Sequence, residues 1–240
     1  MTAGTPSWYA RMLTAEERVL RRAIGSRLRE RDAAVELGGD ANRVRHPTLG
    51  HVASERLIPG VDAPAVELEH HVARYAWAMR FCEGRSVLDV GCGAGYGSYL
   101  LSWVAADVTG IDRSAQAIAV AQRTYPGPEF RVEDATAGLP TAEIATSFEV
   151  LEHVDDPAAL CRQLLGAAPE VLLSYPNPLF AGPHLNPHHL VDWPLRTLKS
   201  VLSREGATAI DVYHQRYTSP AIRRGSPWWA AIWLLRVRVR

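Results

Sequence analysis

Glycines occupy every second position from 91 to 97, directly after the apolar residues 87–90. Because glycine has no Cβ, the backbone amides of such a loop can approach a bound ligand closely. A dinucleotide site requires Gly-x-Gly-x-x-Gly, but Tyr96 occupies the third glycine position. A phosphate-binding loop is excluded as well, because no Gly-Lys-Ser/Thr follows and the chain has a single lysine, Lys199. We therefore expect a ligand without a phosphate chain.

Acidic residues lie in or at the end of three of the apolar segments. Asp112 follows Asp89 by 23 residues, which is close to the ~20-residue offset at which an acid reaches ribose hydroxyls. Asp134 ends the next segment, where a carboxylate can accept a hydrogen bond from an adenine amino group. Each acid alone also fits an ordinary surface position at a strand end. Together they predict a nucleoside ligand whose other end is zwitterionic.

Glu149, Glu152 and His153 stand at positions i, i+3 and i+4, so they would converge on one helical turn. Two carboxylates and an imidazole suit Mg²⁺, Mn²⁺ or Fe²⁺, and His189 can supply a fourth ligand. Such an ion would orient a substrate hydroxyl bound to it and lower the pKa of that hydroxyl. Without a metal, His153 could act alone as a base. The alternative is that the two glutamates are packing residues and that His153 lies satisfied in the core.

Short apolar segments alternate with helical segments after residue 84. This alternation predicts a parallel sheet with helices on both faces, an α/β fold of the doubly wound type. A helix at 195–204 and a strand at 207–214 follow. The predicted strands of the alternating part are 86–90, 107–111, 129–132, 144–148 and 171–175, and its helices are 96–104, 114–125 and 157–167.

Two further helices precede this part. Thr14 and Glu17 form a capping box that predicts a helix over 14–37, and a second helix is predicted from Pro64 to Phe81. Residues 38–62 have no periodicity and are expected to form a long loop that covers a site or crosses the surface. The expected divisions are 1–62 as helix and covering loop, 63–215 as the main domain and 216–240 as a tail.

The composition excludes several classes of protein. The 240 residues include 26 basic and 26 acidic residues, so no overall field attracts long nucleic acid or an anionic membrane. Three distant cysteines support neither a disulfide framework nor a structural zinc module. The first residues lack the apolar stretch of a secretory signal, and no apolar run reaches the ~20 residues of a membrane span. We expect a cytoplasmic location.

The tail is locally basic and aromatic. No acidic residue follows Asp211, while arginines accumulate beside Trp228, Trp229 and Trp233. A solvated, partly disordered terminus is the expected state. A segment that binds an interface or a partner is the alternative.

Four motifs occur in order: VLDVGCGAGYGSYL, VTGIDRSAQAIAVA, RVEDA and FEVLEHV. They resemble the class I S-adenosylmethionine-dependent methyltransferases, and the resemblance covers roughly residues 57–214. It implies a doubly wound, Rossmann-like methyltransferase sheet with an N-terminal helical extension. Residues 55–60 and 71–75 are similar to the leading segment of a subgroup often found in glycan and natural-product biosynthesis.

The resemblance also implies roles for particular residues. Asp89 and the first glycines would hold the methionine part of S-adenosylmethionine, Asp112 the ribose, and Asp134 with Ala135 the adenine. Arg74 and Tyr75 would form a wall over the cofactor, with Arg74 near its carboxylate; the alternative places Arg74 on a solvated helix face. The full set of expected cofactor contacts is Arg74, Tyr75, Asp89, Gly91, Cys92, Gly93, Gly95, Asp112, Arg113, Asp134, Ala135 and Glu149.

The Glu-x-x-Glu-His pattern with a later histidine resembles metal-dependent O-methyltransferases, including small-RNA terminal methyltransferases and polyprenyl-catechol enzymes. His189 fits better than His188, because Asp192-Trp193 follows at the spacing found there. The resemblance thus implies Glu149, Glu152 and His153 as catalytic residues, and the same three with His189 as metal ligands.

The leading hypothesis is O-methylation of a hydroxyl on a sugar or small natural product, with Mg²⁺ or Mn²⁺ as a further cofactor. Alternatives are N- or C-methylation of a small metabolite, methylation of an RNA end, and a non-catalytic binding subunit. The expected partner is a small-molecule acceptor, and a homodimer is compatible with the sequence. Asn177 is a candidate for the acceptor pocket or a turn former.

Overall fold

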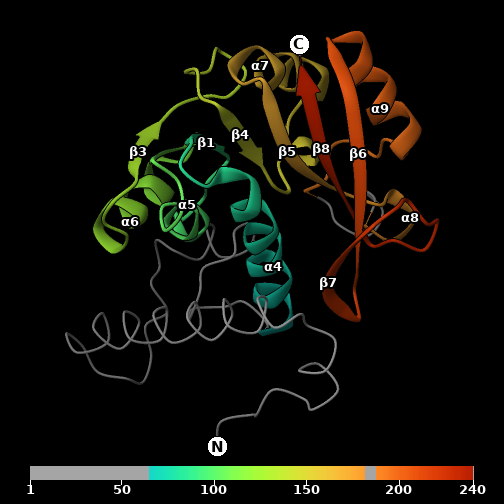
Figure 1. Ribbon diagram of the computed structural model, residues 1–240, viewed down its shortest axis with the longest axis horizontal. Helices are drawn as coiled ribbons and strands as arrows, with labels where there is room; N and C mark the ends of the chain where they lie inside the picture. Colours follow the sequence, from blue (N-terminus) through green and yellow to red (C-terminus); the bar gives the residue numbers. More distant parts are fainter. Residues whose placement is uncertain (1–64, 182–187, 240) are drawn as a thin grey trace, which may run out of the picture.

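The computed structural model describes residues 65–181 and 188–239. Eight strands form one sheet in the order β3-β2-β1-β4-β5-β8-β6-β7 (Figure 1). The first five strands of this order are parallel, whereas β8 is antiparallel to both of its neighbours and β7 is antiparallel to β6. The strands are β1 (Ser86–Val90), β2 (Asp107–Asp112), β3 (Glu129–Val132), β4 (Ile144–Ser147), β5 (Glu170–Pro176), β6 (Ala207–Arg216), β7 (Ser219–Arg224) and β8 (Ile232–Val239).

Helices cover both faces of the sheet, and successive strand residues point into different cores. Val87 of β1 belongs to the core with α4, α5 and α6, whereas Leu88 belongs to the core with α7 and α9. This twofold alternation lets a parallel sheet bury both of its faces. The predicted α/β, doubly wound fold is confirmed. The helices are α4 (Ala65–Cys82), α5 (Tyr96–Leu101), α6 (Ala115–Thr124), α7 (Pro157–Ala167), α8 (Pro178–Ala181) and α9 (Leu195–Arg204).

The predicted elements agree closely with the observed ones. The five predicted parallel strands each match within one residue at either end, and the helices at 157–167 and 195–204 match α7 and α9. The helix predicted at 96–104 ends earlier, at Leu101, where the Ser102 hydroxyl donates to the Tyr99 carbonyl at 2.8 Å. The helix predicted at 14–37 and the loop at 38–62 lie outside the described residues.

The expectation of a solvated, partly disordered terminus is wrong. Ser219–Arg224 and Ile232–Val239 are strands, and β8 lies inside the sheet between β5 and β6 (Figure 1). The alternating Arg-Val-Arg-Val sequence is a strand pattern in which Leu235 and Val237 are fully buried.

Acidic residues on the neighbouring strands compensate the arginines of β8. Arg236 donates to Glu170 of β5, and Arg238 donates to Asp211 of β6 at 3.0 Å. Glu170 also accepts from Arg85 at 2.8 Å. Burial would raise the pKa of Glu170, but the hydrogen bonds from Arg85 and Arg236 bring it below its usual value. The basic tail is therefore paired charge within a sheet.

Within the described residues, no helix has the combination of length and hydropathy that crossing a bilayer requires. The longest, α4, packs instead against α5 and β7. Tyr75 in the middle of α4 packs against Phe148, directly after β4, and its hydroxyl lies 3.5 Å from Asp89 of β1.

Candidate active site

The carboxyl ends of the parallel strands carry most of the residues selected from the sequence. The glycine loop follows β1, Asp112 is the last residue of β2, and Glu149 lies two residues after the end of β4. A short 3₁₀ helix, η1 (Leu151–His153), comes next. Open α/β sheets bind ligands in the crevice at this edge. The selected residues therefore meet where a ligand is expected.

The glycine loop is held against β2 and tolerates no side chain at its first position. The amides of Gly91 and Cys92 both donate to the Ile111 carbonyl, at 2.8 and 2.9 Å. Gly91 has φ +75°, and a Cβ there would lie 2.4 Å from a methyl carbon of Val150. Both the left-handed backbone and the close packing therefore require glycine. Cys92 is buried, and burial raises the pKa of its thiol well above the usual value.

Asp89 lies behind this loop, with 1% of its surface exposed. One carboxylate oxygen accepts a hydrogen bond from Ser98 at 2.7 Å, and the other accepts one from Thr146 at 2.7 Å. The hydroxyl of Tyr75 is 3.5 Å away. Burial raises the pKa of Asp89 to about 6 despite these hydroxyl donors. Its visible role is to tie β1 to β4, α5 and α4 beneath the loop.

Asp112 joins the glycine loop to the end of β2. Its carboxylate accepts from the amide of Gly93 at 3.0 Å and from the amide of Ser114 at 2.8 Å. Both partners are backbone N–H groups, so the carboxylate stabilises the shape of two adjacent loops. It is 7% exposed and lies at the same strand ends as the loop, as the ribose hypothesis requires.

The residues expected around adenine lie further out. Asp134 is exposed, two residues after β3 ends, and its carboxylate accepts from the amide and the hydroxyl of Thr136 at 2.8 and 2.7 Å. These bonds lower the pKa of Asp134 below its usual value. Ala135 is half-buried against the core of α7 and α9, and Arg113 is exposed.

Arg74 is buried, so the alternative of a solvated helix face is wrong. It is 4% exposed, its Nε donates to Oε1 of Gln215 at 3.0 Å, and its Nη1 lies 3.6 Å from Oε1 of Glu149. Nη1 is buried and has no hydrogen-bond acceptor among the described residues. The neighbouring Tyr75 packs its ring against Gly97, where a Cβ would lie 1.9 Å from it.

Glu149 has a strained backbone and a fixed side chain. Its φ is +55°, the only positive value outside glycine in the described part of the chain. Ser174 of β5 accepts from the Glu149 amide at 2.9 Å and donates to its Oε1 at 2.6 Å. Ser174 thereby holds the carboxylate beside Arg74.

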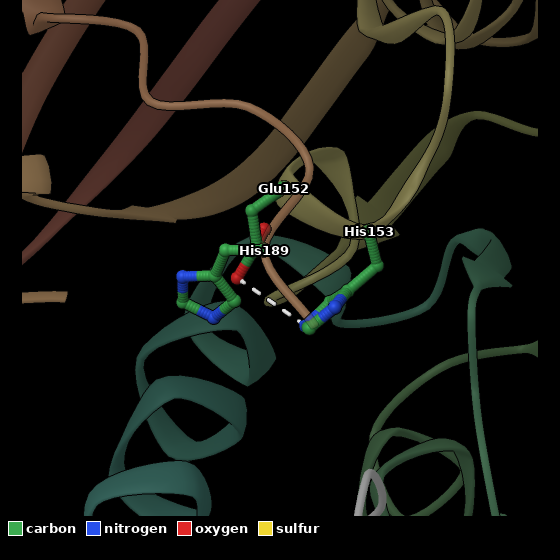
Figure 2. Close-up of side chains that lie close together, drawn as sticks. All are labelled: Glu152, His153 and His189. Atoms are coloured by element: carbon green, nitrogen blue, oxygen red, sulfur yellow. Dashed lines mark ion pairs between the residues drawn. The ribbon is translucent and has the colours of Figure 1, made fainter. Parts of the chain in front are cut away.

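Glu152, His153 and His189 form a group of three (Figure 2). One ligand atom from each lies within 4.8 Å of the others. Both oxygens of Glu152 are buried and lack a hydrogen-bond partner in the described part of the chain. Burial, and secondarily the charge of Glu149, raises the pKa of Glu152 well above its usual value. Because η1 begins only at Leu151, the structure leaves Glu149 outside this group, contrary to the predicted convergence on one helical turn.

Two contacts to backbone carbonyls join the segments of this group. The Leu190 amide donates to the Glu152 carbonyl at 2.7 Å, and Nδ1 of His153 lies 3.0 Å from the His188 carbonyl. Since a carbonyl only accepts, Nδ1 carries the proton. The other ring nitrogen, Nε2, lies 3.9 Å from Oε1 of Glu152. Histidines that bind metals show this arrangement: one ring N–H donates to a carbonyl, and the other ring nitrogen binds the metal.

Residues 65–221 match the family described as "Methyltransferase domain". The chain belongs to this family. A probable S-adenosylmethionine-dependent methyltransferase of Mycolicibacterium smegmatis is 31% identical over 181 residues, which cover 70% of each chain. A Mycobacterium tuberculosis relative of the same description is 30% identical, and the alignment spans 62% of its length. The chain is thus an S-adenosylmethionine-dependent methyltransferase, as the motifs predicted.

More distant matches extend the comparison. A ubiquinone biosynthesis O-methyltransferase of Paraburkholderia xenovorans is 38% identical over 105 residues, covering 38% of this methyltransferase and 45% of that enzyme. The N-methyltransferase NodS of Bradyrhizobium japonicum, solved with S-adenosylhomocysteine, has a TM-score of 0.60 at 17% identity, covering 80% of this chain and 98% of that one. This second likeness concerns the fold and confirms a class I sheet.

Two residues of the methyltransferase site escaped the sequence analysis. Ser174 could have been suspected, because it is a polar residue inside the apolar strand 171–175. Gln215 had no signal, because it lies just beyond the predicted strand 207–214. Asn177 is a turn former in the structure: its side chain donates to the carbonyls of Trp228 and Ala230 and accepts from the amide of Leu179.

Proposed function

We propose that this methyltransferase transfers the methyl group to a hydroxyl of a small acceptor, a sugar or a natural product, with a divalent metal ion bound by Glu152, His153 and His189. The observation that carries the proposal is the buried carboxylate of Glu152, which has no hydrogen-bond partner among the described residues and lies in one group with His153 and His189. A buried carboxylate without a donor is costly in the absence of a cation.

The cofactor side of the site fits S-adenosylmethionine, which supplies a methyl group on a cationic sulfonium. Arg74 offers a buried N–H group that lacks an acceptor in the part of the chain that the structure describes, and this suits the carboxylate of the methionine part. Asp112 would receive the ribose hydroxyls, and the glycine loop would lie against the bound molecule. Asp134 and Ala135 would flank the adenine from the exposed side. Asp89 would act indirectly, by supporting the loop from behind.

The metal hypothesis fits the donor set. A divalent ion, when bound, would hold the acceptor hydroxyl and lower its pKa. The three candidate ligand atoms lie within 4.8 Å of one another. Donors at neighbouring positions on one ion lie closer together than this, so the group would have to contract around the ion. Glu149 would stay with Arg74 and Ser174. The protein's own contribution is to position the acceptor. Only in a site without metal would Nε2 of His153 accept the proton of the acceptor hydroxyl.

Among the relatives, the ubiquinone enzymes are named as O-methyltransferases and NodS as an N-methyltransferase. The histidine and carboxylate group favours oxygen, because an alcohol has a proton to lose and is a poor nucleophile at neutral pH. An amine acceptor needs no such group. The second candidate is therefore transfer to nitrogen or carbon, and the methylation of RNA ends is a third.

The decisive experiment measures transfer of labelled methyl groups from S-adenosylmethionine into a panel of glycosides and small hydroxylated products. We expect turnover that stops with EDTA and returns with Mg²⁺ or Mn²⁺. His189→Ala should lower metal-dependent turnover roughly 100-fold and abolish Mn²⁺ binding in calorimetry. His188→Ala, an exposed neighbour, is the matched control and should retain both. Turnover insensitive to EDTA, with labelled amines as products, would support the second candidate instead.

The other expectations from the sequence stay predictions. They are a small-molecule acceptor, a cytoplasmic location, the absence of long nucleic acid, a homodimer, and the division at 62. The subgroup of glycan and natural-product enzymes belongs with them.

A further inference from the structure

Gln215 of β6 is fully buried beside Arg74 of α4. Its Oε1 accepts from Nε of Arg74 at 3.0 Å, and its Nε2 donates to the carbonyls of His70 at 3.1 Å and Pro220 at 2.9 Å. A guanidinium only donates and a carbonyl only accepts, so all three partners demand the same orientation of the amide. The position of Gln215 is therefore fixed by α4, β6 and β7 together.

The guanidinium of Arg74 is consequently hydrogen-bonded at Nε but not at Nη1. Gln215 takes Nε, while Nη1 lies 3.6 Å from Glu149, beyond hydrogen-bond distance, and has no other acceptor among the described residues. A buried N–H group without an acceptor costs free energy that a ligand oxygen can recover. Because the guanidinium is planar, fixing Nε also fixes the directions of both terminal nitrogens.

We propose that Gln215 is a positioning residue, which sets the guanidinium of Arg74 so that Nη1 meets the carboxylate of S-adenosylmethionine. The inference rests on the proposed role of Arg74. Without the acceptor at Nε, Arg74 can turn fully toward Glu149, whose carboxylate then competes with that of the cofactor. Gln215 would thus prevent an internal ion pair from closing the carboxylate subsite.

The test compares two ligands that differ by one group. Calorimetric titration gives the dissociation constants of S-adenosylmethionine and of decarboxylated S-adenosylmethionine for each variant. For Gln215→Met we expect roughly tenfold weaker binding of the complete cofactor, the loss of one hydrogen bond's contribution at a charged group. The decarboxylated ligand should bind with less than a twofold change. The ratio of the two constants is measured in the same folded protein, so general destabilisation does not produce it.

Gln215→Glu is the conservative variant, because it keeps the acceptor oxygen for Nε of Arg74. We expect it to restore most of the ratio. If Gln215→Met does not fold, Gln215→Leu removes the same acceptor and takes its place. Asn177→Leu is the matched control: it removes a buried amide from the same half of the sheet without touching Arg74. It should lower the melting temperature and leave the ratio at the wild-type value.

Arg74→Ala separates this inference from the proposed function. If Arg74→Ala abolishes the preference for the complete cofactor and Gln215→Met does not, the positioning role is refuted and the role of Arg74 stands. If Arg74→Ala keeps the preference, the assignment of Arg74 fails and the inference fails with it. Equal weakening of both ligands in Gln215→Met would show that Gln215 supports only the fold.

Discussion

Arg236 of β8 donates a hydrogen bond to Glu170 at the start of β5, and these residues lie on strands that pair directly. Arg85, at the end of the turn before β1, reaches the same carboxylate from the other side. The buried carboxylate of Glu170 therefore joins the parallel part of the sheet to β8, which was expected to belong to a solvated tail.

Glu170→Gln should lower the free energy of unfolding by about 2 kcal/mol at pH 7, because both arginines lose their counter-charge in a largely buried position. The lowered pKa of Glu170 gives the pH dependence: its stabilisation is complete above the unfolded-state value near 4.5 and is lost as the pH falls through the folded-state value. In urea unfolding, the difference in free energy of unfolding between wild type and variant should be smaller below pH 4 than at pH 7. Glu129→Gln, in an exposed pair with Arg131, is the control and should leave the midpoint unchanged. A gap that widens in acid would contradict this account.

Asp89→Asn should show the opposite pH dependence. Burial raises the pKa of Asp89 to about 6, so the folded protein binds a proton that the unfolded chain releases near pH 4. Wild type should therefore gain about 2 kcal/mol relative to the variant as the pH falls from 7 to 4, since the shift is about two pKa units and is not yet fully expressed at pH 4. Parallel urea titrations of the two proteins measure this difference. A difference in free energy of unfolding that stays constant between pH 7 and pH 4 would show that the pKa of Asp89 is not raised.

Gly91→Ala should weaken the binding of S-adenosylmethionine and lower the melting temperature. The new Cβ would lie 2.4 Å from Val150, and the positive φ alone costs about 1–2 kcal/mol for a residue with a side chain. In the double variant Gly91→Ala with Val150→Ala, the loss of stability due to the steric contact should disappear, and the loss due to the positive φ should remain. Val150→Ala alone is the reference, with calorimetry and thermal melts as the measurements. Full recovery in the double variant would mean that the backbone conformation is not strained.

Two substitutions at Glu149 isolate its backbone strain. Both Glu149→Gly and Glu149→Ala remove the contacts to Ser174 and Arg74, but only glycine adopts φ +55° without a penalty. We expect the glycine variant to be more stable than the alanine variant by about 1 kcal/mol, the reverse of the usual order. Chemical denaturation measures the difference. An alanine variant of equal or greater stability would indicate that the loop relaxes at this position.

The sequence predicted the parallel half of the fold well, because twofold hydrophobic alternation and glycine turns are local signals. Spacing placed Glu152 beside His153, and the resemblance to metal-dependent O-methyltransferases added His189; the structure brings these three together but not Glu149, the fourth predicted member. The misreading of Ile232–Val239 has a non-local cause: the arginines of a strand look solvated until Glu170 and Asp211, distant in the chain, are placed beside them. Glu149 was misplaced for a related reason, since its partner Ser174 belongs to another strand. Arg74 could not be distinguished from a surface arginine, because Gln215 lies 141 residues away.

The interior position of β8 also governs how the molecule can be assembled during synthesis. In chain order it is the eighth strand, yet it separates β5 from β6. The hairpin of β6 and β7 leaves the ribosome first and has no docking place on the sheet until Ile232–Val239 emerges. Strands β1 to β5 can pair early, whereas the β6–β7 hairpin, which carries Gln215, can join the sheet only after β8 has been synthesised. In a nascent chain stopped before Ile232, only the contacts of the β6–β7 hairpin with α4 would hold Gln215 beside Arg74.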